Sequence, residues 1–207
     1  MKQATEEFSL SFKEKIELAK LLDKLGVSVI ELEGIRNQKI DSLQIKSIAA
    51  VVSGSVIAVP VQLSEESVEL TFAALQYAKK PRLQVCAPTS DLQMEYFFHK
   101  KPEGMLCAIR ATVAACKMRC ADVEFVADDA TRSDPAFLAQ AITAAVEAGA
   151  TTVTVCDTAG TMLPGEFAAF IAELYAAVPA LANVTLGVSC SNALAMADSC
   201  VIAAIGQ

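Results

Sequence analysis

Six short runs of apolar, mostly β-branched residues alternate with longer amphipathic stretches along the chain. Short apolar runs bounded by turn residues are typical of buried strands. Most runs begin roughly 30 residues after the one before, the size of one β-α unit in a parallel sheet. The pattern therefore predicts parallel strands, each followed by a covering helix. The expected strands are residues 27–34 (VSVIELEG), 56–61 (VIAVPV), 83–88 (LQVCAP), 123–129 (VEFVADD), 151–157 (TTVTVCD) and 184–190 (VTLGVSC).

Capping residues mark the ends of the predicted helices. Ser11 followed by Glu14 is a capping-box pattern, and it precedes a helix that Gly26 is expected to end. Ser133 or Asp134 is expected to cap a later helix in the same way.

Polar residues gather where five of the predicted strands end. In a β/α barrel all carboxyl ends of the strands meet at one mouth, whereas an open doubly wound sheet binds ligands chiefly at one switch point. Five polar strand ends therefore favour a barrel. These residues are Glu31, Glu33, Thr89, Ser90, Asp128, Asp129, Asp157, Thr158 and the stretch 189–192.

The length of the chain predicts an incomplete barrel. An eight-stranded barrel of this type takes about 250 residues, whereas the chain has 207 and opens with a helix that no predicted strand precedes. We expect one partial barrel domain over residues 1–207, with six parallel strands and the first and eighth strands missing.

Composition excludes several classes of partner. The net charge of -7 argues against nucleic acid, and no apolar segment reaches the roughly 18 residues of a membrane span. The N-terminus lacks the apolar core of a secretion signal, so a cytoplasmic location is expected. Seven scattered cysteines are expected to be free thiols, and Cys116 with Cys120 lacks the further ligands of a zinc site.

Several segments, in order, resemble one enzyme family. VEFVADDATRSDPAFL and AGATTVTVCDTAGTMLP are similar to its fifth and sixth strands with their turns, while FSLSFKEKIELAKLLDKLGVSVIELEG and RLQVCAPTSDLQMEY are similar to earlier parts. The family is that of α-isopropylmalate synthases, homocitrate synthases and HMG-CoA lyases, which are metal-dependent TIM-type β/α barrels. The resemblance implies chemistry in which an acyl-CoA enolate attacks a 2-oxo acid and a divalent metal stabilises the oxyanion.

The residues that hold the metal in this family are replaced here. Its two His ligands, from an HxHND motif, fall on Ser189 and Ser191, and its Asp ligand falls on Met1. Two further His of the synthases fall on Gln84 and Gln93. Hydroxyl groups are poor substitutes for imidazole at a transition-metal site. We therefore expect no metal ligands and no cofactor.

Four residues match positions that contact or support the oxo acid in the family: Asp128, Arg132, Thr158 and Asn192. For the pair Asp128 and Asp129, which match such positions together, a simpler role is also open, namely capping the next helix and pairing with Arg132. His99, the single His of the chain, is expected at the surface, with a general base as the alternative.

Cys156 is not expected to act as a nucleophile, because no base or cation is visible beside it. No catalytic residue is assigned.

Three functions remain open. The first is a degenerate relative without metal-dependent activity that binds a small 2-oxo acid or carboxylate, or a protein. The second is an acyltransferase subunit, active with a complementing chain or as part of a longer polypeptide. The third is a structural role in which exposed sheet edges drive association. The first and last strands would be those edges, so a homo-oligomer is expected, unless six strands close on themselves or the terminal helices cover the gap.

Overall fold

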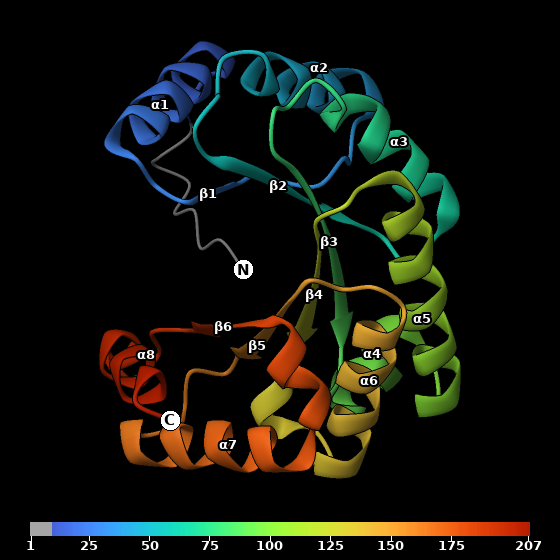
Figure 1. Ribbon diagram of the computed structural model, residues 1–207, viewed down its shortest axis with the longest axis vertical. Helices are drawn as coiled ribbons and strands as arrows, with labels where there is room; N and C mark the ends of the chain where they lie inside the picture. Colours follow the sequence, from blue (N-terminus) through green and yellow to red (C-terminus); the bar gives the residue numbers. More distant parts are fainter. Residues whose placement is uncertain (1–9) are drawn as a thin grey trace.

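Six parallel strands form one sheet in which each strand pairs with the next along the chain (Figure 1). The computed structural model describes residues 10–207. Met1, the position matched to the family's metal-binding Asp, lies outside these residues. The strands are β1 (Val29–Glu31), β2 (Val56–Val61), β3 (Pro81–Pro88), β4 (Val123–Asp128), β5 (Thr152–Asp157) and β6 (Thr185–Cys190).

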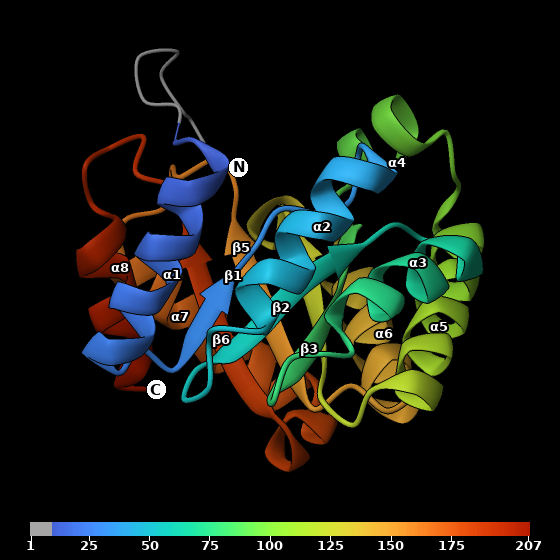
Figure 2. The same cartoon turned by 90° about the horizontal axis from the view of Figure 1, so that it is seen from above.

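Helices follow the strands and cover the outer side of the curved sheet (Figure 2). This repeated strand-helix order is the one that the hydrophobic pattern predicts. The helices are α1 (Phe12–Leu25), α2 (Gln38–Ala49), α3 (Glu65–Leu75), α4 (Asp91–Phe98), α5 (Pro102–Arg119), α6 (Pro135–Glu147), α7 (Pro164–Ala177) and α8 (Ala197–Ile205), with short 3-10 helices η1 (Ala130–Arg132) and η2 (Pro179–Asn183). Within residues 10–207, none of the helices combines the length and apolar character needed to cross a membrane.

The sheet curls without closing. Within the described residues β1 pairs only with β2 and β6 pairs only with β5. Figure 1 shows the resulting arc, with α1 and α8 at its two ends. The prediction of an incomplete TIM-type β/α barrel with six parallel strands is confirmed. The alternative in which six strands close on themselves is wrong.

The first strand is shorter than predicted. Residues 27–34 were expected to be extended, but only Val29–Glu31 form strand β1. Among the described residues β1 has β2 as its single neighbouring strand, so fewer of its residues form backbone hydrogen bonds to a partner. The apolar pattern of a sequence does not show whether a strand will lie at the edge of the sheet. The third strand begins earlier than expected, at Pro81.

The predicted caps are present. The Ser11 hydroxyl accepts a hydrogen bond from Glu14 N, and the Glu14 carboxylate accepts one from Ser11 N, which completes the capping box. Gly26 ends α1 with a left-handed φ of 84°. Of the two candidate caps of α6, Asp134 is the one that accepts a hydrogen bond from Phe137 N, at 2.9 Å.

The two faces of the sheet differ in chemistry. Strand residues that face the helices, such as Leu83, Phe125 and Val153, are fully buried in one apolar core. Alternate residues face the inside of the arc, and several of these are polar, including Gln84 and Glu124. The apolar core therefore lies between sheet and helices, and the inside of the arc is polar.

Candidate functional site

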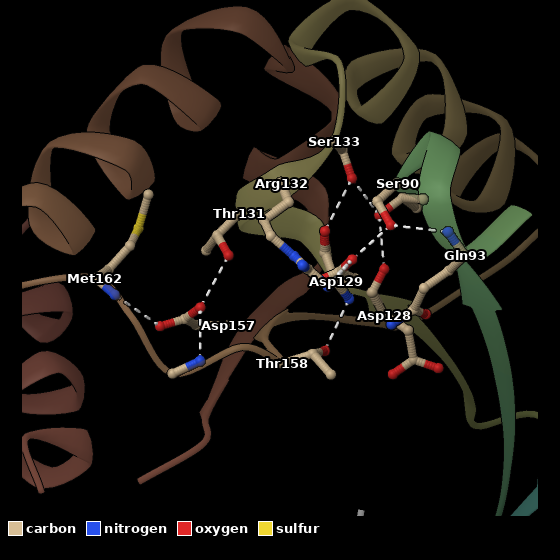
Figure 3. A network of polar contacts seen from close by, with 12 residues as sticks. Ser90, Gln93, Asp128, Asp129, Thr131, Arg132, Ser133, Asp157, Thr158 and Met162 are labelled. Carbon is tan, nitrogen blue, oxygen red and sulfur yellow. Dashed lines mark hydrogen bonds and ion pairs between the residues drawn. The ribbon is translucent and has the colours of Figure 1, made fainter. Parts of the chain in front are cut away.

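The turn after β4 is built around Asp129, whose backbone is left-handed (φ 60°) and whose side chain is completely buried. Its carboxylate accepts hydrogen bonds from the hydroxyl of Ser90 and from Arg132 Nε and Nη2, the last two at 2.7 and 2.8 Å. Its backbone N–H donates to Thr158 Oγ1 at 2.9 Å (Figure 3). Asp129 thus joins the turns that follow β3, β4 and β5. The simpler interpretation, pairing with Arg132, is correct for Asp129, whereas the helix cap is Asp134.

Asp157 organises the turn after β5 in a similar way. Its carboxylate accepts hydrogen bonds from Thr131 Oγ1 at 2.9 Å, Gly160 N at 3.2 Å and Met162 N at 3.3 Å. Asp157 as a whole is 1% exposed. Three donors stabilise the buried carboxylate, and the bonds hold the loop so that Thr158 lies beside the turn after β4.

A cavity of about 300 Å³ opens at the carboxyl ends of the last three strands. This is the mouth that the strand-end residues predicted. None of the described residues that line the cavity carries a positive charge. The lining residues are Gln93, Asp128, Cys156, Asp157, Thr158, Ser189 and Ser191.

Asp128 is the titratable group that distinguishes this cavity. Figure 3 shows its carboxylate pointing away from the network around Asp129. Burial raises the pKa of Asp128 to about 6, and the nearby charges of Asp129 and Glu31 act in the same direction. The side chain can therefore exchange a proton near neutral pH.

The thiol in the cavity is not activated. Burial raises the pKa of Cys156 to about 12, and the Asp128 carboxylate also raises it. A nucleophilic cysteine needs the opposite shift. This agrees with the expectation that Cys156 is not a nucleophile.

Two of the four predicted substrate-binding residues line the cavity, and two do not. Asp128 and Thr158 lie in its wall. Arg132 is turned toward Asp129, and its side chain is 46% exposed. Asn192 is exposed, and its Oδ1 accepts a hydrogen bond from Ala197 N at 3.1 Å, just before α8.

The remaining residues singled out in the sequence, His99, Gln84 and Gln93, lie in three different parts of the structure. His99 ends α4 with a left-handed φ of 50° and lines a different surface pocket. Gln93 lies in the cavity, whereas Gln84 belongs to a network on the inner face of the sheet. Sequence reasoning did not find that network, although a Gln and a Glu inside otherwise apolar strands were a usable signal.

The cavity does not fit a divalent metal of the kind that the resemblance implies. Ser189 and Ser191, at the positions of the two imidazole ligands, both line it and offer neutral hydroxyls. Across residues 10–207, no cluster of three or more His, Cys, Asp or Glu side chains could hold a metal ion.

The fold and the strand-end cavity are those of a β/α-barrel protein, and comparison with known proteins gives the family. Residues 2–207 match the family model described as HMGL-like. The chain is 35% identical over 197 residues to a 2-isopropylmalate synthase of Pelotomaculum thermopropionicum, and 37% identical over 197 residues to one of Carboxydothermus hydrogenoformans. The chain belongs to the HMGL-like family.

The sequence matches cover most of this chain but only a minor part of the two synthases. In both synthases 95% of the chain aligns with 39% of the relative. An HMG-CoA lyase of Pseudomonas aeruginosa superposes on 97% of this chain and 68% of its own, with a TM-score of 0.77 and 18% identity. A Bacillus subtilis HMG-CoA lyase gives a TM-score of 0.79 over 96% of this chain and 68% of its own, at 16% identity. These structures support the barrel-type fold.

Proposed function

We propose that this chain is a non-catalytic relative of the 2-isopropylmalate synthases that binds a small carboxylic acid, such as a 2-oxo acid, without a metal ion. The observation that carries the proposal is the presence of Ser189 and Ser191 in the cavity wall, at the positions of two imidazole ligands. Hydroxyls can donate hydrogen bonds to a carboxylate, but they bind transition metals poorly.

The charges around the cavity make this binding depend on pH. An ionised ligand would meet the carboxylates of Asp128 and Asp157, and like charges in a partly buried site repel. Since the pKa of Asp128 is about 6, the side chain is neutral at lower pH and can donate a hydrogen bond to the ligand. The affinity for a carboxylate should therefore rise as the pH falls through this value.

Calorimetry with pyruvate as the probe tests the proposal. Pyruvate should bind more tightly at pH 5.5 than at pH 7.5, on the order of tenfold, because the fraction of protonated Asp128 limits the apparent affinity. Ser189→Ala should weaken binding, and Ser199→Ala on the exposed side of α8 is the matched control.

Two further measurements address the absence of catalysis. Titration with manganese, magnesium and zinc should give no saturable binding, and a mixture of acetyl-CoA and pyruvate should release no free CoA. Micromolar metal affinity or steady CoA release by the purified chain would contradict the proposal. The variant Ser189→His with Ser191→His serves as the positive control, because it should gain zinc affinity.

A second candidate function is an acyltransferase subunit that needs further polypeptide. The observation that favours it is the unpaired outer edge of β1 and of β6, between which the described arc stays open. The test is coexpression with the part of the Carboxydothermus hydrogenoformans synthase outside the matched 197 residues. Release of CoA by that mixture, with Ser189 and Ser191 intact, would favour this candidate over the first.

We also propose a homo-oligomer in the cytoplasm. Leu21 and Leu25 on α1 are 64% and 76% exposed, and apolar surface of this kind supports self-association. All seven cysteines are free, as is usual in a reducing compartment. Light scattering at micromolar concentration checks the first point, since a monomer contradicts it. Fractionation of cells that express the chain checks the second.

A further inference from the structure

A groove of about 600 Å³ lies between α2 and α3. Figure 1 shows these two helices side by side on the outer side of the sheet, where they also contact each other. The groove shares no lining residue with the cavity at the carboxyl ends of the strands. It is therefore a second, separate concave surface, and the function proposed above makes no use of it.

The α2 wall of the groove has the spacing of a single helix face. Lys39, Ser42, Leu43 and Lys46 line it, and residues three, four and seven apart lie on one side of a helix. Seven residues cover about two turns, or roughly 10.5 Å. Leu43, between the two lysines, is 58% exposed. This wall thus presents two cations with an uncovered apolar side chain between them.

The α3 wall is apolar and built partly from small side chains. Leu70, Ala73 and Ala74 line it, again at three- and four-residue spacing. How closely two helices approach depends on the side chains at their contact, so alanines leave room for bulky side chains of another helix. The two walls together have the shape that accepts one further helix.

The groove offers hydrogen-bond donors and lacks acceptors. Lys39 and Lys46 are the charged residues that line it, in a chain whose net charge is -7. Neither lysine forms an ion pair within residues 10–207. The Ser42 hydroxyl is buried without a hydrogen-bond partner among the same residues. Lys46 Nζ lies 5.9 Å from the centroid of the Tyr77 ring, which holds this cation beside the end of α3. The complementary ligand is therefore anionic and rich in acceptors.

We propose that the groove binds an amphipathic helix of a partner polypeptide that carries acidic side chains seven residues apart. Its carboxylates accept hydrogen bonds from Lys39 and Lys46. Its leucines, three and four residues after each acidic position, pack on Leu43, Leu70 and Ala73. This is recognition of a helix in a groove, with anchors at the same spacing on both sides.

A second copy of this chain is a weaker occupant. Its α7 presents Glu166 and Glu173 at the required spacing, but the exposed residues between them are Ala169 and Ala172, which bury little apolar surface. The carboxylate of Glu166 also accepts a hydrogen bond from Leu163 N at 2.9 Å, so it is already engaged.

A labelled helical peptide of about 21 residues, or three heptads, is the probe, since much shorter helices are marginal in water. It carries glutamate at the first position of each heptad and leucine at the fourth and fifth, with alanine and glutamine elsewhere. Fluorescence anisotropy should show saturable binding that weakens as salt is added, because salt screens exposed ion pairs. A matched peptide with lysine in place of each glutamate should not bind.

Charge reversal on α2 tests the two ion pairs. Lys39→Glu with Lys46→Glu should lower the affinity for the glutamate peptide on the order of tenfold, because two attractive pairs become repulsive. The same double variant should bind the lysine peptide instead. The matched control is Lys13→Glu with Lys20→Glu on α1, two exposed lysines at the same spacing. It should leave the affinity for both peptides unchanged at physiological salt.

Filling the groove tests the apolar contact. Ala73→Leu should lower the affinity severalfold, because the new side chain occupies the place of a partner leucine. Ala176→Leu, at an exposed position of α7, should not change it. An unchanged thermal melt shows that each variant folds. No binding at millimolar glutamate peptide, equal binding of the two peptides, or equal loss in groove and control variants would overturn the proposal. So would a dimer whose interface shields α2 and α3 from hydrogen exchange.

Discussion

Gly160 lies so close to Ser191 that a Cβ built on the glycine would be 2.4 Å from the carbonyl oxygen of the serine. Gly160 also has a left-handed φ of 65°, a conformation that side chains disfavour. The contact joins the turn after β5 to the end of β6, and it therefore sets the rim of the cavity.

Gly160→Ala should destabilise the chain by about 1–3 kcal/mol through backbone strain and the forced shift of Ser191. A thermal melt should move down by several degrees. Gly165→Ala in α7 is the matched control, because a Cβ there meets nothing within 4 Å. An unchanged melt for Gly160→Ala would show that the turn is free to adapt.

Asp128→Asn should make the protein more stable at neutral pH. Because the pKa of Asp128 is about 6 in the folded state, above the value of 3.8 for an unperturbed carboxyl, the folded state holds the proton more tightly. The stability that this supplies is present at low pH and is lost as the pH rises from about 4 through 6. At pH 7.5 the substitution should raise the free energy of unfolding, measured with urea, by about 1–3 kcal/mol. The loss of stability between about pH 4 and pH 6 should be absent from the variant. Asp198→Asn on exposed α8 should change neither quantity.

The carboxylate of Asp23 on α1 clamps the loop before β2. It accepts backbone hydrogen bonds from Ser53, Gly54 and Ser55 at 3.0, 2.9 and 2.7 Å. These bonds lower the pKa of Asp23 to about 2. A lowered carboxyl pKa contributes stability that is present above about 4 and is lost as the pH falls toward 2. Asp23→Asn should therefore lower the urea midpoint at pH 7 and reduce its fall between about pH 4 and pH 2. An unchanged fall of the midpoint over this range would contradict the role of Asp23 in holding the loop.

The cysteines should differ sharply in reactivity. Cys107 is exposed, whereas burial raises the pKa of Cys116 and of Cys156 to about 12. Iodoacetamide at pH 7.5 should alkylate Cys107 first, and the two buried thiols only after urea unfolds the chain. Mass spectrometry of timed digests measures the order. Rapid labelling of Cys156 in the native protein would reopen the question of a nucleophile.

The sequence predicts most of the fold because each β-α unit repeats the same local signals. The capping box at Ser11, the end of α1 at Gly26 and strands β2, β4, β5 and β6 agree with expectation to within about one residue. The length of β1 could not be predicted, because it depends on the absence of a second pairing partner and not on local pattern.

The arrangement of the candidate site was predicted in part. The strand-end rule placed Asp128 and Thr158 at the mouth of the barrel, where both line the cavity, because strand direction fixes where their side chains emerge. Arg132 and Asn192 come from turns, where one left-handed residue such as Asp129 redirects the chain that follows. The network around Gln84 depends on the pairing of distant strands, which no local window reveals.

The placement of the apolar core outside the arc makes the packing of the sheet mainly local. Each strand buries its apolar side beneath the neighbouring helices, and adjacent strands and adjacent helices make most of the contacts between elements. In this respect the described residues resemble a solenoid, in which each repeat contacts chiefly its neighbours. A substitution in the core of one β-α unit should therefore disturb mainly the units on either side of it.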